Sequence, residues 1–392
     1  MQFGLTETQQ TLKNTVRKFL AAECPMSEVR KLMETATALD SALWSKIAEQ
    51  GWNGMILAEE HGGFGMGMVE MAAALEEMGR ALLPGPFFST VLMAGPLLEG
   101  ASNEGARQKY LSAISSGQAK AAVALLEASA SWSPDSIRMQ ATSSTGKYTL
   151  DGRKLFVWDA AVADFLVSVA RLNGELALLL VPAKAPGLRI TDLPAMDSTR
   201  KLYEVAFDGV SVPRENLLAE GKPARAALDR MLNVATVGLV AEMTGGMQRL
   251  LEMTVEYAKT RKQFGRPIGQ FQAVQHMCAD MLVYTESSRS AAYYAAWAIQ
   301  EGVPEAPLAV SVAKAYASDA YREVGNRAIQ VHGGMGFTWE NDAHLFYRRA
   351  KASEVAFGDA TYHRERIAKL VIDAGQVQKD EPVLSAVISQ SH

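Results

Sequence analysis

The sequence contains little of what metal-binding, secreted and membrane-spanning proteins need. Only two cysteines occur among 392 residues, Cys24 and Cys278, and their wide separation predicts two thiols in a reducing compartment rather than a metal site. The six histidines lack the spacing of metal ligands, so no metal is expected. No run of about 18 apolar residues is present, and the first residues lack the pattern of a secretion signal. Together these absences predict a cytoplasmic protein without a membrane span.

An excess of positive charge is also missing. The chain has 39 lysines and arginines against 43 aspartates and glutamates, a formal net charge of -4, which argues against a general affinity for nucleic acid. Apolar residues make up 48% and charged residues 21%, which is the composition of an ordinary globular protein. A chain of this length is too long for one compact core and suits two or three packed domains.

The spacing of apolar residues divides the chain into three parts. Helical periodicity dominates residues 1–118, where Thr6 and Gln9 suit a capping box. Short apolar runs separated by glycine, aspartate and proline turns follow in 119–223 and indicate a small β-barrel or sandwich. Residues 224–392 return to long helical stretches joined by short loops, which is typical of a four-helix bundle. The predicted fold is therefore α+β, with these three domains in this order.

Two details of this prediction concern turns and helices. In the central region, Asp151-Gly152 and Asn173-Gly174 are each flanked by strand patterns, so both are expected to be hairpin turns. In the last region, Gly245 and Gly246 fall inside a long helix, where we expect them to permit close helix packing rather than to make room for substrate. The four helices expected there cover 226–260, 273–302, 308–331 and 340–374.

Two stretches of the last region carry residues that suit a dinucleotide. In 257–272, Arg261 ends a long helix and can place a planar, permanently charged fork on a pyrophosphate. In 328–340, Gly333 and Gly334 let backbone N–H groups approach a phosphate or an adenosine closely. Taken alone, Arg261 also suits a surface ion pair, and the glycines also suit helix packing or a helix end.

These two stretches resemble the acyl-CoA dehydrogenase family, and weaker matches at 58–63, 150–154 and 207–213 lie in the expected order along nearly the whole chain. The resemblance implies an FAD-dependent enzyme that desaturates an acyl-CoA and passes electrons to an electron-transfer flavoprotein. It also implies a tetramer built on the C-terminal bundles, in which each subunit grips the ADP half of an FAD held mainly by its neighbour. The implied cofactor contacts are Arg261, Phe264, Gln272, Gln330, Gly333 and Gly334.

The residue expected to perform the chemistry of this family is missing. A carboxylate in relatives removes the α-proton of the thioester while the flavin takes a hydride. The usual glutamate slot holds Phe357 here, and an alternative slot on the first bundle helix holds Ala235. Glu242 lies two helical turns beyond Ala235, about 10.5 Å along the helix, and Asp359 follows Phe357 closely. Both carboxylates are weak candidates for a displaced base.

The flavin-ring side of the resemblance is altered as well. Leu126 stands where relatives have a hydrogen-bonding threonine. Trp158 stands where they have a threonine or serine beside the flavin, and an indole there can stack on the ring or occlude its space. Contacts to a neighbour's FAD are thus kept while the chain's own flavin site is eroded. This asymmetry predicts a subunit that pairs with a different family member and completes its FAD site.

Stretches 84–89 and 357–365 resemble the branch of the family that forms heterotetramers in bacterial breakdown of steroid side chains and dicarboxylic acids. Two other interpretations stay open. In one, the chain forms a self-sufficient homo-oligomeric dehydrogenase in which Glu242 or Asp359 is the base. In the other, the chain has a different role, either another flavin chemistry or a scaffold. A DNA-binding role is disfavoured by the acidic balance of charge.

Overall fold

The N-terminal region of the chain is helical in the computed structural model, which describes residues 4–373. Its helices are α1 (Glu7–Glu23), α2 (Met26–Met33), α3 (Ser41–Glu49), α4 (Met68–Arg80), the π-helix η3 (Phe88–Ala94), α5 (Gly95–Glu99) and α6 (Glu104–Ser115). Thr6 and Gln9 form the expected capping box, since the side chain of each accepts from the backbone N–H of the other. Helix α4 is buried along most of its length, because it packs against both α1 and the C-terminal helices.

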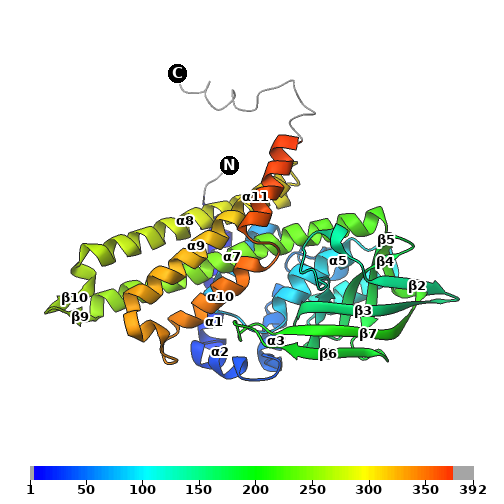
Figure 1. The fold of residues 1–392 in the computed structure, drawn as a ribbon, viewed down its shortest axis with the longest axis horizontal. Coiled ribbons are helices and arrows are strands. Elements are labelled where there is room, and N and C mark those ends of the chain that lie inside the picture. The colour runs from blue at the N-terminus through cyan, green and yellow to red at the C-terminus, as the bar shows by residue number, and fades with distance from the viewer. Residues whose placement is uncertain (1–3, 374–392) are drawn as a thin grey trace, which may run out of the picture.

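The central region is an eight-stranded sheet. Its strands are β1 (Ala121–Ala124), β2 (Gln140–Ser144), β3 (Lys147–Trp158), β4 (Phe165–Leu172), β5 (Glu175–Pro182), β6 (Leu188–Leu193), β7 (Leu202–Pro213) and β8 (Leu217–Glu220). They pair in the order β6-β7-β3-β2-β4-β5-β8, and β1 runs parallel to β4 off this path. Alternate residues of β4 and β5 enter different cores, one within the sheet region and one that continues into the helices. Figure 1 shows the sheet at one end of the molecule, with the long helices extending away from it.

Only one of the two expected hairpin turns is present. Asn173 and Gly174 join β4 to β5 with φ angles of 53° and 88°, which confirms that turn. The prediction of a turn at Asp151-Gly152 is wrong, because β3 runs through these two residues and pairs with β7 both before and after them. Gly152 lies instead at a shift of register, where its φ of 144° accommodates a bulge. The chain actually reverses at Gly146, between β2 and β3.

The C-terminal region contains α7 (Lys222–Thr260), α8 (Gln272–Gln300), α9 (Ala306–His332), α10 (Ala343–Val355) and α11 (Ala360–Ala368). The prediction of a single helix over 340–374 is wrong, because the chain turns between α10 and α11. Residue 374 itself lies outside the described residues. Phe357 and Gly358 have positive φ angles of 57° and 100° in this turn. The buried ammonium of Lys314 donates to the carbonyls of Glu354 and Gly358 at 3.0 and 2.8 Å, so the carbonyls freed by the break are satisfied. Within residues 4–373, no helix is long and apolar enough to cross a membrane.

Helices α4 and α7 cross with their backbones in contact. A Cβ added to Gly245 of α7 would lie 1.7 Å from the carbonyl oxygen of Glu76, and Gly79 of α4 is equally intolerant of a side chain. Gly246 meets α9, where an added Cβ would lie 2.2 Å from the hydroxyl of Tyr321. The expectation that Gly245 and Gly246 serve close packing is confirmed.

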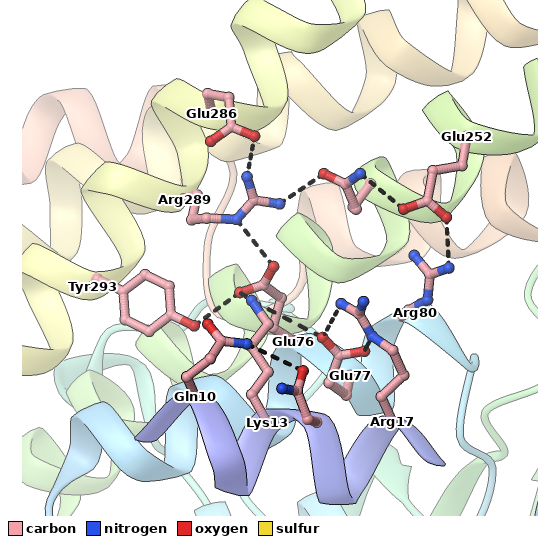
Figure 2. A network of polar contacts seen from close by, with 12 residues as sticks. Gln10, Lys13, Arg17, Glu76, Glu77, Arg80, Glu252, Glu286, Arg289 and Tyr293 are labelled. Carbon is pink, nitrogen blue, oxygen red and sulfur yellow. Dashed lines mark hydrogen bonds and ion pairs between the residues drawn. The ribbon is translucent and has the colours of Figure 1, made fainter. Parts of the chain in front are cut away.

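A buried network of charges joins α1, α4, α7 and α8 beside this crossing (Figure 2). The Lys13 ammonium lies 2.6 Å from Glu76, and Arg289 contacts the same carboxylate at 3.0 Å. Arg17 donates two hydrogen bonds of 2.8 and 2.7 Å to Glu77. Although burial opposes ionisation, Lys13 and Arg289 hold the pKa of Glu76 below its ordinary value. Glu76 therefore depends on these cations to stay charged in the interior.

Replacing Lys13 by methionine is expected to lower the free energy of unfolding by about 2–3 kcal/mol at neutral pH, because Glu76 loses one of its two cations while Arg289 remains. A carboxyl group whose pKa is lowered by folding stabilises the fold at pH values above its unfolded pKa of about 4.3. This stabilisation is lost as the pH falls through the lower pKa of the folded state. Denaturant titrations should therefore show the difference shrinking below about pH 4. The control is Lys259→Met, which breaks an exposed pair with Glu256 and should change stability by less than about 0.5 kcal/mol. Equal losses in both variants would contradict the role given to the network.

Candidate functional site

Four aromatic side chains from four separate segments meet where the sheet faces the helices. Phe357 lies 4.8 Å from Trp132, 5.4 Å from Trp158 and 6.0 Å from Phe88, measured between ring centroids. Phe88 and Trp158 also contact each other at 5.2 Å. The indole N–H of Trp132 donates to the carbonyl of Val355 at 3.2 Å and ties its loop to the end of α10. We call these four side chains the aromatic cluster.

Phe357, in the slot where the resemblance leads one to expect a glutamate, is fully part of this cluster. Only 2% of its surface is exposed. The positive φ of Phe357 is costly for a residue with a large side chain, and it persists because Gly358 and the Lys314 contacts fix the turn around it. The ring cannot accept a proton, and three other aromatic rings pack around it.

Glu242, the first candidate for a displaced base, is engaged in an ion pair. One guanidinium nitrogen of Arg200 lies 2.9 and 3.2 Å from the two carboxylate oxygens, and both side chains are almost buried. The close α4–α7 crossing leaves the backbone of Glu242 no room to move, since a Cβ added to Gly79 would lie 2.0 Å from its carbonyl oxygen. Glu242 is thus held as the partner of Arg200 rather than as a free carboxylate.

Asp359, the second candidate, begins a helix. Its carboxylate accepts from the backbone N–H of Tyr362 at 2.8 Å and is the N-cap of α11. Because it caps this helix, the carboxylate of Asp359 suits a structural role better than that of a base.

Two polar residues next to the cluster were not found from the sequence. Arg200 lies over Trp158, with its guanidinium carbon 4.2 Å from the ring centroid, and over Phe88 at 5.2 Å. Asp159 is 2% exposed, and burial raises its pKa to about 6 although it accepts from the Ser89 hydroxyl at 2.8 Å. No motif marks either residue, and only tertiary contacts bring them together.

The loop that carries Trp132 is closed by hydrogen bonds to Glu127. Glu127 accepts from the backbone N–H groups of Arg138 and Met139 and from the ammonium of Lys154, all within 2.9 Å. Burial lowers the pKa of Lys154 to about 8, against the effect of this carboxylate. Leu126, in the expected threonine slot, is buried. An open groove of about 620 Å³ lies beside the loop, and its lining mixes charges, including Glu127, Arg138, Arg153 and Glu204.

The expected FAD contacts lie at the other end of the long helices. Arg261 is the C-cap of α7, and the hairpin of β9 (Lys262–Gln263) and β10 (Arg266–Pro267) carries Phe264 at its tip, where 92% of its surface is exposed. Gln272 is the first residue of α8. Figure 1 shows this hairpin at the end of the bundle remote from the sheet. These residues are thus distant from the aromatic cluster of their own chain.

The second predicted stretch, residues 328–340, begins in α9 and lies at the same end of the bundle. Gln330 is in the last turn of α9, and Gly333 and Gly334 follow it, all three exposed. Tyr257 and His332 stack at 4.5 Å and hold the two stretches together. A Cβ added to Gly333 or Gly334 would meet no atom within 4 Å, so these glycines border open space. The exposed arginine and open backbone suit the ADP part of a dinucleotide. We call the region around the aromatic cluster, between the sheet and the helices, the crevice.

The order of a helical region, a sheet and a bundle of long helices is the fold that the resemblance to a family of flavoprotein dehydrogenases implies. The chain belongs to the acyl-CoA dehydrogenase family, whose members are flavin oxidoreductases. Residues 6–118 match the family model of the acyl-CoA dehydrogenase N-terminal domain, and residues 224–372 match that of the C-terminal domain.

Individual relatives resemble the chain over nearly its whole length. The probable acyl-CoA dehydrogenase YngJ of Bacillus subtilis is 29% identical over 385 residues, which cover 95% of this chain and 100% of that protein. Acyl-CoA dehydrogenase FadE27 of Mycobacterium tuberculosis is 31% identical over 377 residues, 94% of this chain and 98% of that one. A chain of the ChsE4-ChsE5 complex from Mycobacterium tuberculosis superposes with a TM-score of 0.86 at 29% identity, covering 95% of this chain and 99% of that one.

Proposed function

We propose that this chain is one subunit of an FAD-dependent acyl-CoA dehydrogenase and that it completes the FAD site of a different family member. The observation that carries this proposal is the burial of Phe357 against Trp132 and Trp158 in its own crevice. Desaturation of a thioester needs a positioned base and a flat slot for the flavin. Within this chain the aromatic cluster occupies that slot.

The exposed end of the bundle supports the other half of the proposal. Arg261, Gln330 and Gly334 face solvent far from the crevice of the same chain, so an FAD that they touch would belong to another subunit. Arg261 would hold the pyrophosphate, and the open backbone at Gly333 and Gly334 would admit the adenosine side. The bound FAD would accept the hydride, with the acyl-CoA and the base supplied at the partner's crevice.

Pairing with a second family member also fits the comparisons. One solved structure that this chain resembles is a complex named for two components, ChsE4 and ChsE5. An electron-transfer flavoprotein would then reoxidise the flavin of the assembly. A homo-oligomer with Glu242 or Asp359 as base is less well supported, because the first is paired with Arg200 and the second caps a helix.

The test is a visible absorption spectrum, with flavin quantified after denaturation, for the chain purified alone and after co-expression with the family member encoded beside it. Purified alone, the chain should carry little FAD, and FAD should appear when the two proteins co-purify. A full complement of FAD on the chain alone, bleached by an acyl-CoA, would overturn the proposal. In that case Glu242→Ala or Asp359→Ala should abolish the bleaching.

A further inference from the structure

Arg200 lies at the centre of the contacts that hold the aromatic cluster together. Its guanidinium carbon is 4.2 Å from the centroid of Trp158 and 5.2 Å from that of Phe88, so a single cation lies over both rings. The same group donates to both carboxylate oxygens of Glu242 at 2.9 and 3.2 Å. Its side chain is only about 10% exposed. An arginine can do this because a flat guanidinium stacks on a ring and still donates from its edge.

The loop that carries Arg200 is anchored on both sides. Before it, Asp197 and Thr199 each contact the buried guanidinium of Arg349 from α10 at 2.5 Å. After it, the ammonium of Lys201 donates to the carbonyl of Met33 at 2.9 Å. The loop is therefore fixed to the bundle and to the N-terminal helices independently of the aromatic rings. The position of Arg200 is set by this scaffold rather than by the side chains that it covers.

The aromatic residues, by contrast, rest on backbone that is costly to maintain. Asp159, directly after Trp158, has a φ of 56°, and Phe357 has a φ of 57°. One carboxylate oxygen of Asp159 is buried without a hydrogen-bond partner among residues 4–373. The other accepts from Ser89, which follows Phe88, and so couples the backbones that carry the two rings under Arg200. Such an arrangement persists only where neighbouring contacts over-determine it.

We propose that Arg200 is a positioning residue that keeps Trp158 and Phe88 in place and thereby holds this crevice closed to a flat ligand. Only the identification of the crevice as a degenerate flavin site rests on the proposed function. Glu242 acts as the counter-charge of Arg200, which gives this buried carboxylate on α7 a structural role. Loss of the arginine should release the indole of Trp158 and admit water to the crevice.

The test uses the full chain labelled with 5-fluorotryptophan, with the fluorine resonance of Trp158 assigned by Trp158→Phe among the six tryptophans. The readout is the solvent-isotope shift of that resonance between H₂O and D₂O, which reports water at the indole. Arg200→Met should give Trp158 a clear isotope shift that the parent lacks. Arg200→Lys should give a smaller one, because lysine keeps the charge but cannot lie flat on the ring. Arg230→Met, which removes an exposed arginine that pairs with the largely buried Glu99, is the matched control and should give none.

Because Arg200→Met leaves Glu242 buried without its partner, the double variant Arg200→Met, Glu242→Leu is measured beside it to keep the fold intact. The proposal would be overturned if Trp158 showed no isotope shift in any variant, including Arg200→Lys, whose melting temperature equals that of the parent. The measurement is made on this chain alone, so it does not depend on a partner. Failure of the complementing-subunit proposal would appear instead as FAD bound by the isolated chain.

Discussion

Replacing Arg261 by alanine is expected to weaken FAD binding by the assembled enzyme roughly 10- to 100-fold, which corresponds to loss of one hydrogen-bonded charge on a pyrophosphate. Arg261 caps α7 beside the exposed hairpin, and its side chain faces solvent in the single chain. The effect should therefore be seen only in the assembly. Equilibrium titration of the flavin-stripped complex with FAD, followed by flavin fluorescence, measures it directly.

The control for this prediction is Lys259→Ala. Lys259 lies in the last turn of the same helix, is exposed and pairs with Glu256 at 2.7 Å, but it is outside the residues expected to touch the dinucleotide. Its loss removes the same unit of charge from the same end and should weaken FAD binding less than about threefold, because an exposed charge at a distance is screened by salt. If the two variants bind FAD alike, the contact assigned to Arg261 does not exist.

Replacing Gly245 by alanine is expected to lower the free energy of unfolding by at least about 3 kcal/mol, since a Cβ at this position overlaps backbone that cannot yield without separating two helices. The added atom would lie 1.7 Å from the Glu76 carbonyl oxygen and 2.9 Å from the Arg80 amide nitrogen. Separation of α4 from α7 would also disturb the buried charges on Glu76. For a chain of 392 residues this loss should lower the midpoint of thermal unfolding by roughly 4 °C or more.

A second glycine supplies the control. Gly105 is in the first turn of α6, where an added Cβ would meet only the Asn103 side-chain oxygen at 3.7 Å. Gly105→Ala should leave stability unchanged or raise it by up to about 1 kcal/mol, because alanine restricts the unfolded chain without a clash. A Gly245→Ala protein that melts at the same temperature as Gly105→Ala would show that α4 and α7 are not in backbone contact.

Much of the fold could be predicted from local pattern. The capping box at Thr6 and the turn at Asn173-Gly174 follow from rules that act over a few residues. Asp151-Gly152 fits the same turn rule, yet it lies inside β3, because pairing with β7 on both sides outweighs the local preference for a turn. The break between α10 and α11 also depends on a distant group, the buried ammonium of Lys314.

The candidate site could likewise be predicted only in part from the sequence. The sequence indicated that Phe357 and Trp158 replace residues of the family, and the structure adds that they contact each other and that Phe357 also contacts Trp132. The role of Arg200 could not be predicted, since its partners on α7 and η3 are distant in sequence. That the β9–β10 hairpin lies at the end of the bundle remote from the sheet likewise becomes visible only in the folded chain. The assignments of Arg261 and Gly334 to FAD stay predictions until binding is measured.

The central claim is that this chain contributes to a flavin site without having one of its own. The most direct measurement is the number of FAD molecules per chain in the co-purified assembly, determined from flavin absorbance after denaturation and from quantitative amino-acid analysis. With equal amounts of the two subunits, the claim predicts roughly one FAD for every two chains, because only the partner's crevice holds a flavin ring. About one FAD for every chain would mean that the crevice closed by Phe357 binds flavin, and would contradict the claim.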